Sequence, residues 1–411
     1  MEKIDYEYIN EIASIYGTPY YLMFPSVYKQ NVENFAKAFK NYYDKVIVGY
    51  SFKTNYVPVL GRLAKKLGCF AEVVSEMEYD IAKHLGYKNI IFNGPIKTDK
   101  ALIRAIEDGA VVNLDSMYEV DAVCAYSQTC TFRIEVGIRI NIELSDECGA
   151  SRLQNGLRVG RFGFTKEVLT DAIQKLNSCN IDIISVHGHT SSSDRAVNNY
   201  QLIVEQMLAI CEEFNLNNIK YFDIGGGFFG AAANGVDVSN KPKYEDYAKM
   251  VLGIVCNNRW FMSIKPYIVI EPGVSVVANV FAYVSKFYQR KFIAGTNFIS
   301  TDGSVFDVKP TMHSTNLPFK IFAKKESDKL TKCDIVGSTC MEKDIILKQV
   351  DIPMNVGLGD YLYIDGVGAY TIVMTPTFIN YLSPILSVSE RKIELVRRRQ
   401  AIDDIMELYN Y

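Results

Sequence analysis

The chain has 411 residues, more than one ordinary hydrophobic core organises and enough for two domains. Its composition, 48% hydrophobic and 22% charged residues, is typical of a globular protein and excludes a largely disordered one. The net charge is −3 and no basic stripe is present, so we expect no nucleic-acid partner. The sequence contains no run of 18 apolar residues and no apolar leader, which predicts a cytoplasmic protein without a membrane segment.

The cysteine and histidine patterns argue against a disulfide framework and a metal site. Nine cysteines are scattered singly without a CxxC motif, and the four histidines lack the spacing of zinc ligands. We therefore expect a reducing compartment and no structural metal.

Short β-branched segments alternate with amphipathic helical patterns from about residue 27 to residue 275. The expected strands are 46–52, 69–75, 89–94, 111–116, 137–143, 181–188, 221–227 and 267–272. Helical patterns lie between them, for example at 57–68, 76–86, 97–109, 117–127 and 199–214. Eight strand–helix units are the number that closes a parallel barrel, so we expect an α/β barrel over 27–275.

The pattern changes after Gly273 to strand-rich segments separated by Gly and Pro turns. The expected strands are 277–289, 291–303, 333–340, 359–366 and 370–376. They predict an antiparallel β domain over 276–411, which we expect residues 1–26 to join. The tail 393–409 has a helical pattern and predicts a C-terminal helix.

Lys53 follows the first expected barrel strand directly, in GYSFKTN. Catalytic groups collect where barrel strands end, and a lysine amine there must be desolvated or paired. For Lys53 alone, a surface lysine is the simpler interpretation. The motifs at the ends of the later strands decide between a catalytic lysine and a surface lysine.

Three such motifs carry further chemistry. The glycines of DIGGGF (225–227) let backbone N–H groups approach an anion, although a tight turn explains them equally well. Glu271 in IEPG can pair with a protonated ring nitrogen or form a structural ion pair. His187 and His189 form HGH within a strand, where we expect the rings to point to opposite faces. Zinc is an alternative at these histidines, but no further Cys or His group supports it.

An anion cradle, a lysine amine, a carboxylate for a ring nitrogen and an aromatic ring describe a site for pyridoxal 5'-phosphate (PLP). With these motifs the chain resembles the fold type III PLP-dependent decarboxylases, which include diaminopimelate, ornithine and carboxynorspermidine decarboxylases. The resemblance covers nearly the whole chain. It implies a PLP-binding (β/α)8 barrel, a C-terminal antiparallel β domain and a homodimer with shared active sites.

The resemblance also assigns roles to single residues. Those near the cofactor are the Schiff-base lysine Lys53, the stacking His189, the hydroxyl of Ser192, the phosphate loop Gly225, Gly226 and Gly227, the ring-nitrogen partner Glu271, and Tyr370 at the phosphate. Cys340 in GSTCMEKD matches the cysteine that enters the partner subunit's site, and Asp344 completes that motif. Glu72 in AEVVS and the RFGF segment 161–164 also fit family positions.

Three positions depart from diaminopimelate decarboxylases. Val274 replaces the arginine of EPGR, Lys309 replaces a second arginine, and Met341 replaces an acidic substrate contact. Because these positions recognise the distal end of diaminopimelate, the departures would leave its charges unpaired and disfavour it as the substrate.

The segment KPTMHSTNLP resembles decarboxylases of carboxylate-type siderophore pathways, whose substrates are acylated amino acids. Residues that suit a citryl group are Lys309, His313, Ser314, Thr315 and Asn316, with Asp344 as a further substrate contact. The expected substrate is therefore an intermediate like N-citrylornithine, with diaminopimelate or carboxynorspermidine as the alternative.

In the expected reaction, Glu271 keeps the ring nitrogen protonated and Cys340 of the partner donates a proton to Cα. An alanine-racemase-like enzyme would share the barrel and cofactor, but it usually uses a tyrosine base and lacks the Cys–x3–Asp motif. A non-catalytic regulator of the antizyme-inhibitor kind would lose the cofactor residues, and Lys53, Glu271 and the glycines are present.

Overall fold

A computed structural model describes residues 4–146, 148–192, 194–230, 232–233, 236–325 and 327–410. The chain divides into two compact units. One unit contains residues 29–230 and 239–276, and the other contains residues 1–28, 231–238 and 277–411.

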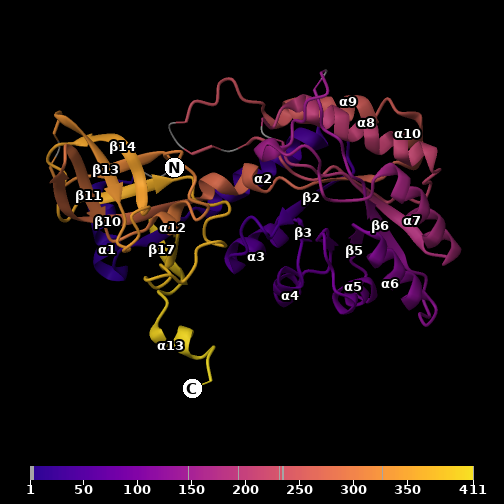
Figure 1. Ribbon diagram of the computed structural model, residues 1–411, viewed down its shortest axis with the longest axis horizontal. Coiled ribbons are helices and arrows are strands. Elements are labelled where there is room, and N and C mark those ends of the chain that lie inside the picture. Colours follow the sequence, from indigo (N-terminus) through magenta and orange to yellow (C-terminus); the bar gives the residue numbers. More distant parts are fainter. Residues whose placement is uncertain are drawn as a thin grey trace. The chain divides into compact units, whose positions relative to one another are not determined.

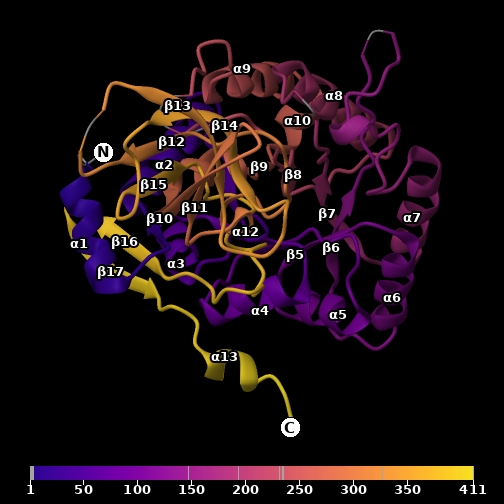
Figure 2. The ribbon, with the colours of Figure 1, turned by 60° about the vertical axis from the view of Figure 1, so that its left-hand side comes forward.

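A closed barrel of eight parallel strands forms the first of these units, as the sequence predicted (Figures 1 and 2). Its strands are β2 (Val46–Ser51), β3 (Phe70–Val73), β4 (Ile90–Phe92), β5 (Val111–Leu114), β6 (Glu135–Arg139), β7 (Asp182–His187), β8 (Tyr221–Asp223) and β9 (Tyr267–Ile270). The helices are α2 (Pro25–Lys40), α3 (Pro58–Lys66), α4 (Glu76–His84), α5 (Asp99–Glu107), α6 (Met117–Ser127), α7 (Lys166–Ser178), α8 (Val197–Glu213), α9 (Tyr244–Val255), α10 (Arg259–Ile264) and α11 (Val274–Val277), with a 3-10 turn at Gln154–Gly156.

The barrel helices begin at residues that stabilise helix starts. Pro58 is the first residue of α3, a position whose backbone N–H would have no acceptor within the helix, so its lack of an N–H costs no hydrogen bond. Ser75 and Thr98 accept hydrogen bonds from the backbone N–H groups of Glu78 and Ala101 and so cap α4 and α5.

The strand register brings polar side chains into one layer at the carboxyl ends of the strands. Ser51 lies opposite Glu72 across β2 and β3, and His187 lies between Arg139 and Asp223 across β6, β7 and β8. The sequence therefore builds a buried polar layer where the catalytic end of a barrel lies.

Glycines make room for this layer. A Cβ on Gly49 would lie 3.3 Å from Cγ of Glu271 and 3.4 Å from Cβ of Glu72. A Cβ on Gly137 would lie only 1.9 Å from Oδ1 of Asn113. The strand therefore needs glycine at position 137, and at position 49 a larger residue would crowd the two carboxyl side chains.

A nine-stranded sheet forms the other unit. Its strands are β1 (Tyr20–Met23), β10 (Phe281–Ile293), β11 (Thr296–Thr301), β12 (Phe319–Phe322), β13 (Leu330–Val336), β14 (Ile345–Pro353), β15 (Tyr361–Asp365), β16 (Ile385–Ser389) and β17 (Lys392–Arg397). Its helices are α1 (Tyr6–Tyr16), α12 (Val305–Val308) and α13 (Ile402–Met406), with a 3-10 turn at Ala278–Val280. Buried side chains of α1, such as Ile9 and Ile12, pack against Leu22 of β1 and Leu386 of β16.

The sheet differs from the sequence prediction in three ways. It is mixed rather than antiparallel, because β1 pairs parallel with β16 and β11 pairs parallel with β13. Residues 370–376 were expected as a strand, but residues 370–374 form turns. The expected helix 393–409 was wrong in its first part, where β17 pairs antiparallel with β16. Glu390 and Arg391 both have positive φ, the geometry of a tight hairpin turn, and only α13 in the tail is helical.

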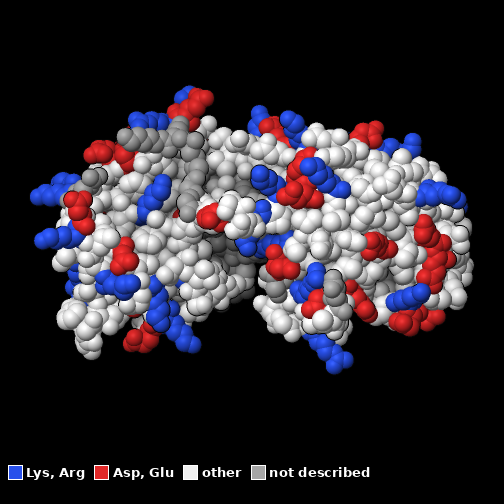
Figure 3. All heavy atoms as spheres, turned by 90° about the horizontal axis from the view of Figure 1, so that it is seen from above, with Lys and Arg blue, Asp and Glu red and all other residues white. Residues whose placement is uncertain are grey.

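Charge and hydropathy of the folded chain add two observations. Lys and Arg side chains are interspersed with Asp and Glu over most of the face in Figure 3. Among the described residues, no helix has both the length and the apolar composition needed to span a bilayer.

Candidate active site

Lys53 and Glu72 form an ion pair at the carboxyl end of the barrel. The Lys53 Nζ donates to Oε1 and Oε2 of Glu72 at 2.7 and 2.6 Å, and Ser51 Oγ donates to Oε2 at 2.5 Å. The Glu72 side chain is fully buried, whereas that of Lys53 is 29% exposed. A buried carboxylate therefore holds a partly exposed amine.

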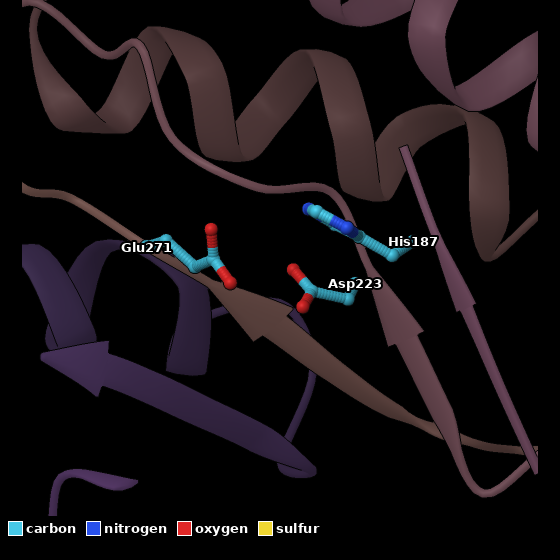
Figure 4. A group of neighbouring side chains, drawn as sticks. All are labelled: His187, Asp223 and Glu271. Atoms are coloured by element: carbon cyan, nitrogen blue, oxygen red, sulfur yellow. The ribbon is translucent and has the colours of Figure 1, made fainter. Parts of the chain in front are cut away.

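Glu271, Asp223 and His187 form a second buried group, and their side chains point toward one another from the ends of β9, β8 and β7 (Figure 4). One potential ligand atom of each lies within 4.8 Å of the others, a spacing that could also hold a metal ion. Burial raises the pKa of Glu271 well above its usual range, and the neighbouring Asp223 raises it further.

In Asp223, Oδ1 accepts from the Gly225 N–H at 2.9 Å, and Oδ2 has no hydrogen-bond partner among the described residues. Burial raises the pKa of Asp223 to about 7, although the Gly225 N–H opposes the rise. Burial, followed by the charge of Arg139, lowers the pKa of His187 well below its usual range, so the imidazole is neutral. Neither ring nitrogen of His187 has a hydrogen-bond partner among the described residues.

The expectation that the HGH rings point to opposite faces was wrong. The rings of His187 and His189 are parallel within 5°, with centroids 6.3 Å apart. His187 is the last residue of β7 and His189 lies in the loop that follows, so both rings belong to the carboxyl end of the barrel. His189 Nδ1 accepts a hydrogen bond from the Gly226 N–H at 3.1 Å, and its pKa is lowered to about 3, mainly by burial.

In the glycine loop after β8, two backbone N–H groups donate to side chains of the site, and the third donates to no backbone carbonyl among the described residues. The Gly225 N–H donates to Oδ1 of Asp223 at 2.9 Å, and the Gly226 N–H donates to His189. A Cβ on Gly225 would lie 2.5 Å from the His189 Cβ. A Cβ on Gly226 would lie 2.4 Å from the Glu271 carbonyl oxygen. Within the described part of the chain, the Gly227 N–H donates to no backbone carbonyl, and Gly227 has a φ of +94°.

Ser192 and the RFGF segment lie in loops of the same unit. Ser192 Oγ accepts a hydrogen bond from the Arg195 N–H at 3.1 Å. Arg161 is exposed and stacks on Phe162 at 4.1 Å, and the same ring contacts the guanidinium of Arg139 at 4.7 Å.

Eight predicted residues belong to the β-rich unit: Lys309, His313, Ser314, Thr315, Asn316, Cys340, Asp344 and Tyr370. Cys340 is exposed in a turn, and buried Asp344 holds this turn by accepting from Thr339 N and Oγ1 and from Val305 N. The Asn316 amide pairs on both sides with the backbone of Lys348. Tyr370 is 39% exposed with φ of +53°.

The polar layer contains residues to which sequence reasoning gave no role. Asn93 Nδ2 donates to Glu271 Oε1 at 2.6 Å, and Asn113 Nδ2 donates to Asn93 Oδ1 at 2.7 Å. Arg139 donates to Asp115 and to the carbonyl oxygen of His189 at 3.2 and 3.3 Å. Each is a single polar residue at a strand end, and only the strand register, which makes them neighbours, could have identified them.

These features define the class of site. The Lys53 amine suits a carbonyl group, the Glu271 carboxyl a ring nitrogen, and the glycine loop a close-lying anion. A metal ion bound by His187, Asp223 and Glu271 would use neither the Lys53 amine nor the glycine loop. PLP would use the amine, the loop and the Glu271 carboxyl. The residues present therefore fit PLP in an α/β barrel.

Comparison with known proteins gives the family. The family described as "Pyridoxal-dependent decarboxylase, pyridoxal binding domain" matches residues 29–278. The chain belongs to this family and is a PLP-dependent amino-acid decarboxylase, a carboxy-lyase.

Similar proteins extend the match beyond the barrel. The diaminopimelate decarboxylase of Aquifex aeolicus is 26% identical over 407 residues, 97% of this chain and 93% of that protein. The enzyme of the same name from Helicobacter pylori strain J99 is 26% identical over 97% of both chains. A structure of the Methanocaldococcus jannaschii diaminopimelate decarboxylase with L-lysine has a TM-score of 0.86 at 24% identity, covering 98% of this chain and 94% of that one.

Proposed function

We propose that this decarboxylase acts on an amino acid of the diaminopimelate type, which carries a second ionic group at its far end. The observation that carries the proposal is the similarity to diaminopimelate decarboxylases over 97% of this chain. It favours the diaminopimelate alternative over N-citrylornithine.

The proposed roles of the barrel residues follow from their contacts. When bound, PLP supplies an electron sink for the electron pair left by the departing carboxylate. Lys53 would bind its carbonyl carbon, His189 would lie against its ring, and Gly227 would donate its N–H to the phosphate. Glu271 would hold a proton at the ring nitrogen. Until then Glu72 keeps the Lys53 amine at the mouth of the barrel.

An acylated amino acid such as N-citrylornithine is the second candidate, and the β-rich unit contains the observation that favours it. Lys309 is buried, and among the described residues its Nζ contacts the carbonyl oxygen of Thr315 at 3.4 Å and no carboxylate. Burial lowers its pKa. A buried amine without a countercharge favours an anionic substrate group. Val274 and Met341 add no charge for a distal zwitterion.

We also propose that the active form is a cytoplasmic homodimer in which Cys340 of one subunit donates a proton to Cα at the partner's site. The exposed turn that carries Cys340, held by buried Asp344, supports this role. We propose further that Tyr370 lies near the phosphate and Ser192 near the cofactor. His313 would lie near the distal group of the substrate.

The substrate is tested by measuring carbon dioxide release from meso-diaminopimelate, N-citrylornithine, carboxynorspermidine and ornithine with the holoenzyme. We expect the highest kcat/KM for diaminopimelate. A kcat/KM for N-citrylornithine that is about tenfold higher would overturn this choice in favour of the second candidate.

A pair of variants tests Lys309. Lys309→Met should raise KM for the preferred substrate about tenfold or more, since a charged contact is lost. Lys320→Met removes an exposed amine in β12 and should leave KM within about twofold. Equal KM values for the two variants would contradict the role of Lys309.

A further inference from the structure

A chain of amide groups runs through the polar layer of the barrel. Asn113 donates to Asn93 at 2.7 Å, and Asn93 donates to Oε1 of Glu271 at 2.6 Å. The same Nδ2 lies 3.4 Å from Oε1 of Glu72. Because Nδ2 carries two protons, one amide contacts the carboxyl proposed for the ring nitrogen and the carboxylate that pairs with Lys53.

The surrounding residues hold this chain in one arrangement. Glu72 accepts hydrogen bonds from Lys53 and Ser51, so Nδ2 of Asn93 must face this carboxyl, and its Oδ1 must face the Asn113 amide. The close approach of Gly137, where a Cβ would lie 1.9 Å from Oδ1 of Asn113, leaves room for that amide. Asn93 and Asn113 are both buried, at 3% and 0% exposure, so bulk water does not compete for these bonds.

A fully buried ion pair fixes the backbone beside the two amides. Lys97 Nζ donates to the carbonyl oxygens of Gly94 and Asn113 at 2.6 and 2.8 Å and pairs with Glu119 at 3.2 Å. It thereby ties the residue after Asn93 to Asn113. The amide chain is thus supported from outside the layer as well as within it.

The charges around Glu271 show what the amide contributes. Asp223 and Glu72 are the acidic groups that face Glu271, Lys53 and Arg139 are the basic ones, and the His187 imidazole is a further titratable neighbour. A neutral donor between Glu271 and Glu72 stabilises negative charge on both without adding charge of its own. A third carboxylate at this point would instead repel both.

We propose that Asn93 is a positioning residue for the decarboxylation, whose amide fixes the Glu271 carboxyl for the ring nitrogen of the cofactor and links it to the Glu72–Lys53 pair. The inference rests on the proposed role of Glu271. Asn93 itself touches neither substrate nor reacting atoms.

The test compares Asn93→Asp and Asn93→Ala with the parent holoenzyme. Asn93→Ala should lower kcat about 10- to 100-fold with KM within about threefold, because an interaction that orients the site is lost while substrate contacts remain. Asn93→Asp, which keeps the shape, should weaken PLP binding about tenfold and move the acid limb of kcat upward by about one pH unit, because the added carboxylate repels Glu271. The absorbance of bound PLP, followed against pH, should shift in the same direction.

Asn257→Asp is the matched control, because it adds the same charge at an exposed position of the same unit. It should leave kcat, PLP affinity and the pH profile unchanged. Asn113→Ala removes the support of Asn93 without touching Glu271, and it replaces Asn93→Ala if that variant does not fold. It should lower kcat with KM unchanged, by less than Asn93→Ala.

Parent-like kcat, PLP affinity and pH profile in Asn93→Asp, or in Asn113→Ala when used as the replacement, would overturn the inference. Glu271→Gln separates this failure from that of the underlying role. If Glu271→Gln is inactive while the Asn93 variants match the parent, only the inference about Asn93 fails. If Glu271→Gln also turns over normally, the proposed role of Glu271 fails with it.

Discussion

Gly225→Ala tests whether the glycine loop positions the stacking histidine. Gly225 has φ of +65°, where an L-residue costs about 1–2 kcal/mol. The new Cβ would lie 2.5 Å from the Cβ and 2.7 Å from the Nδ1 of His189, whereas nonbonded carbon atoms prefer about 3.5–4.0 Å. The His189 ring must therefore move by about 1 Å, and a 1 Å misplacement in an active site can lower the rate about 10²-fold.

Gly109→Ala is the matched control for backbone strain. Gly109 has φ of +72° after α5, and a Cβ added there would meet no other atom within 4 Å among the described residues. Urea unfolding of the PLP-free proteins should show a loss of about 1–2 kcal/mol for Gly109→Ala and a larger loss for Gly225→Ala. Absorbance titration should show PLP binding weakened at least tenfold only in Gly225→Ala. Equal PLP affinity in the two variants would refute the reasoning.

Three further variants probe the polar layer and the dimer. Lys97→Met leaves the Glu119 carboxylate buried without its countercharge, so urea unfolding should lose about 3–5 kcal/mol. Adding Glu119→Gln, which removes the charge but keeps an acceptor for the Asp115 N–H, should restore most of this loss, and no loss in the single variant would contradict the buried pair. Glu271→Gln should still bind PLP, as absorbance shows, but lose about two or more orders of magnitude in kcat; near-parent turnover would argue against its role. Mixing inactive Lys53→Ala and Cys340→Ala subunits should restore about a quarter of parent activity, since heterodimers contain one intact site, and no recovery despite verified subunit exchange would exclude a shared site.

The barrel could be predicted because its strands are short, apolar and separated by helices with clear start and stop residues. Lys53, Glu271 and the glycines at 225–227 each end a strand, so the sequence alone placed them at one rim. The distances between these residues depend on the closed strand order of the barrel. A local sequence pattern does not predict that order.

Other features depended on partners far away in the sequence. Asn93 and Asn113 are ordinary polar residues until β4 and β5 pair and place their amides in contact. The tail 393–409 had a helical pattern, but pairing with β16 through a tight turn made its first part a strand. The histidine prediction failed for a simpler reason, because His189 lies in the loop after β7, and alternate residues of a strand would in any case lie on the same face.

The most direct test of the account is to locate the lysine that binds PLP. Borohydride reduction of the holoenzyme fixes the cofactor covalently, and mass spectrometry of the digest identifies the modified residue. We predict the adduct on Lys53, whose amine is partly exposed and held by Glu72. Lys97 is the contrasting buried amine, engaged by Glu119 and two carbonyl oxygens. An adduct on Lys97, or on any lysine other than Lys53, would contradict the account.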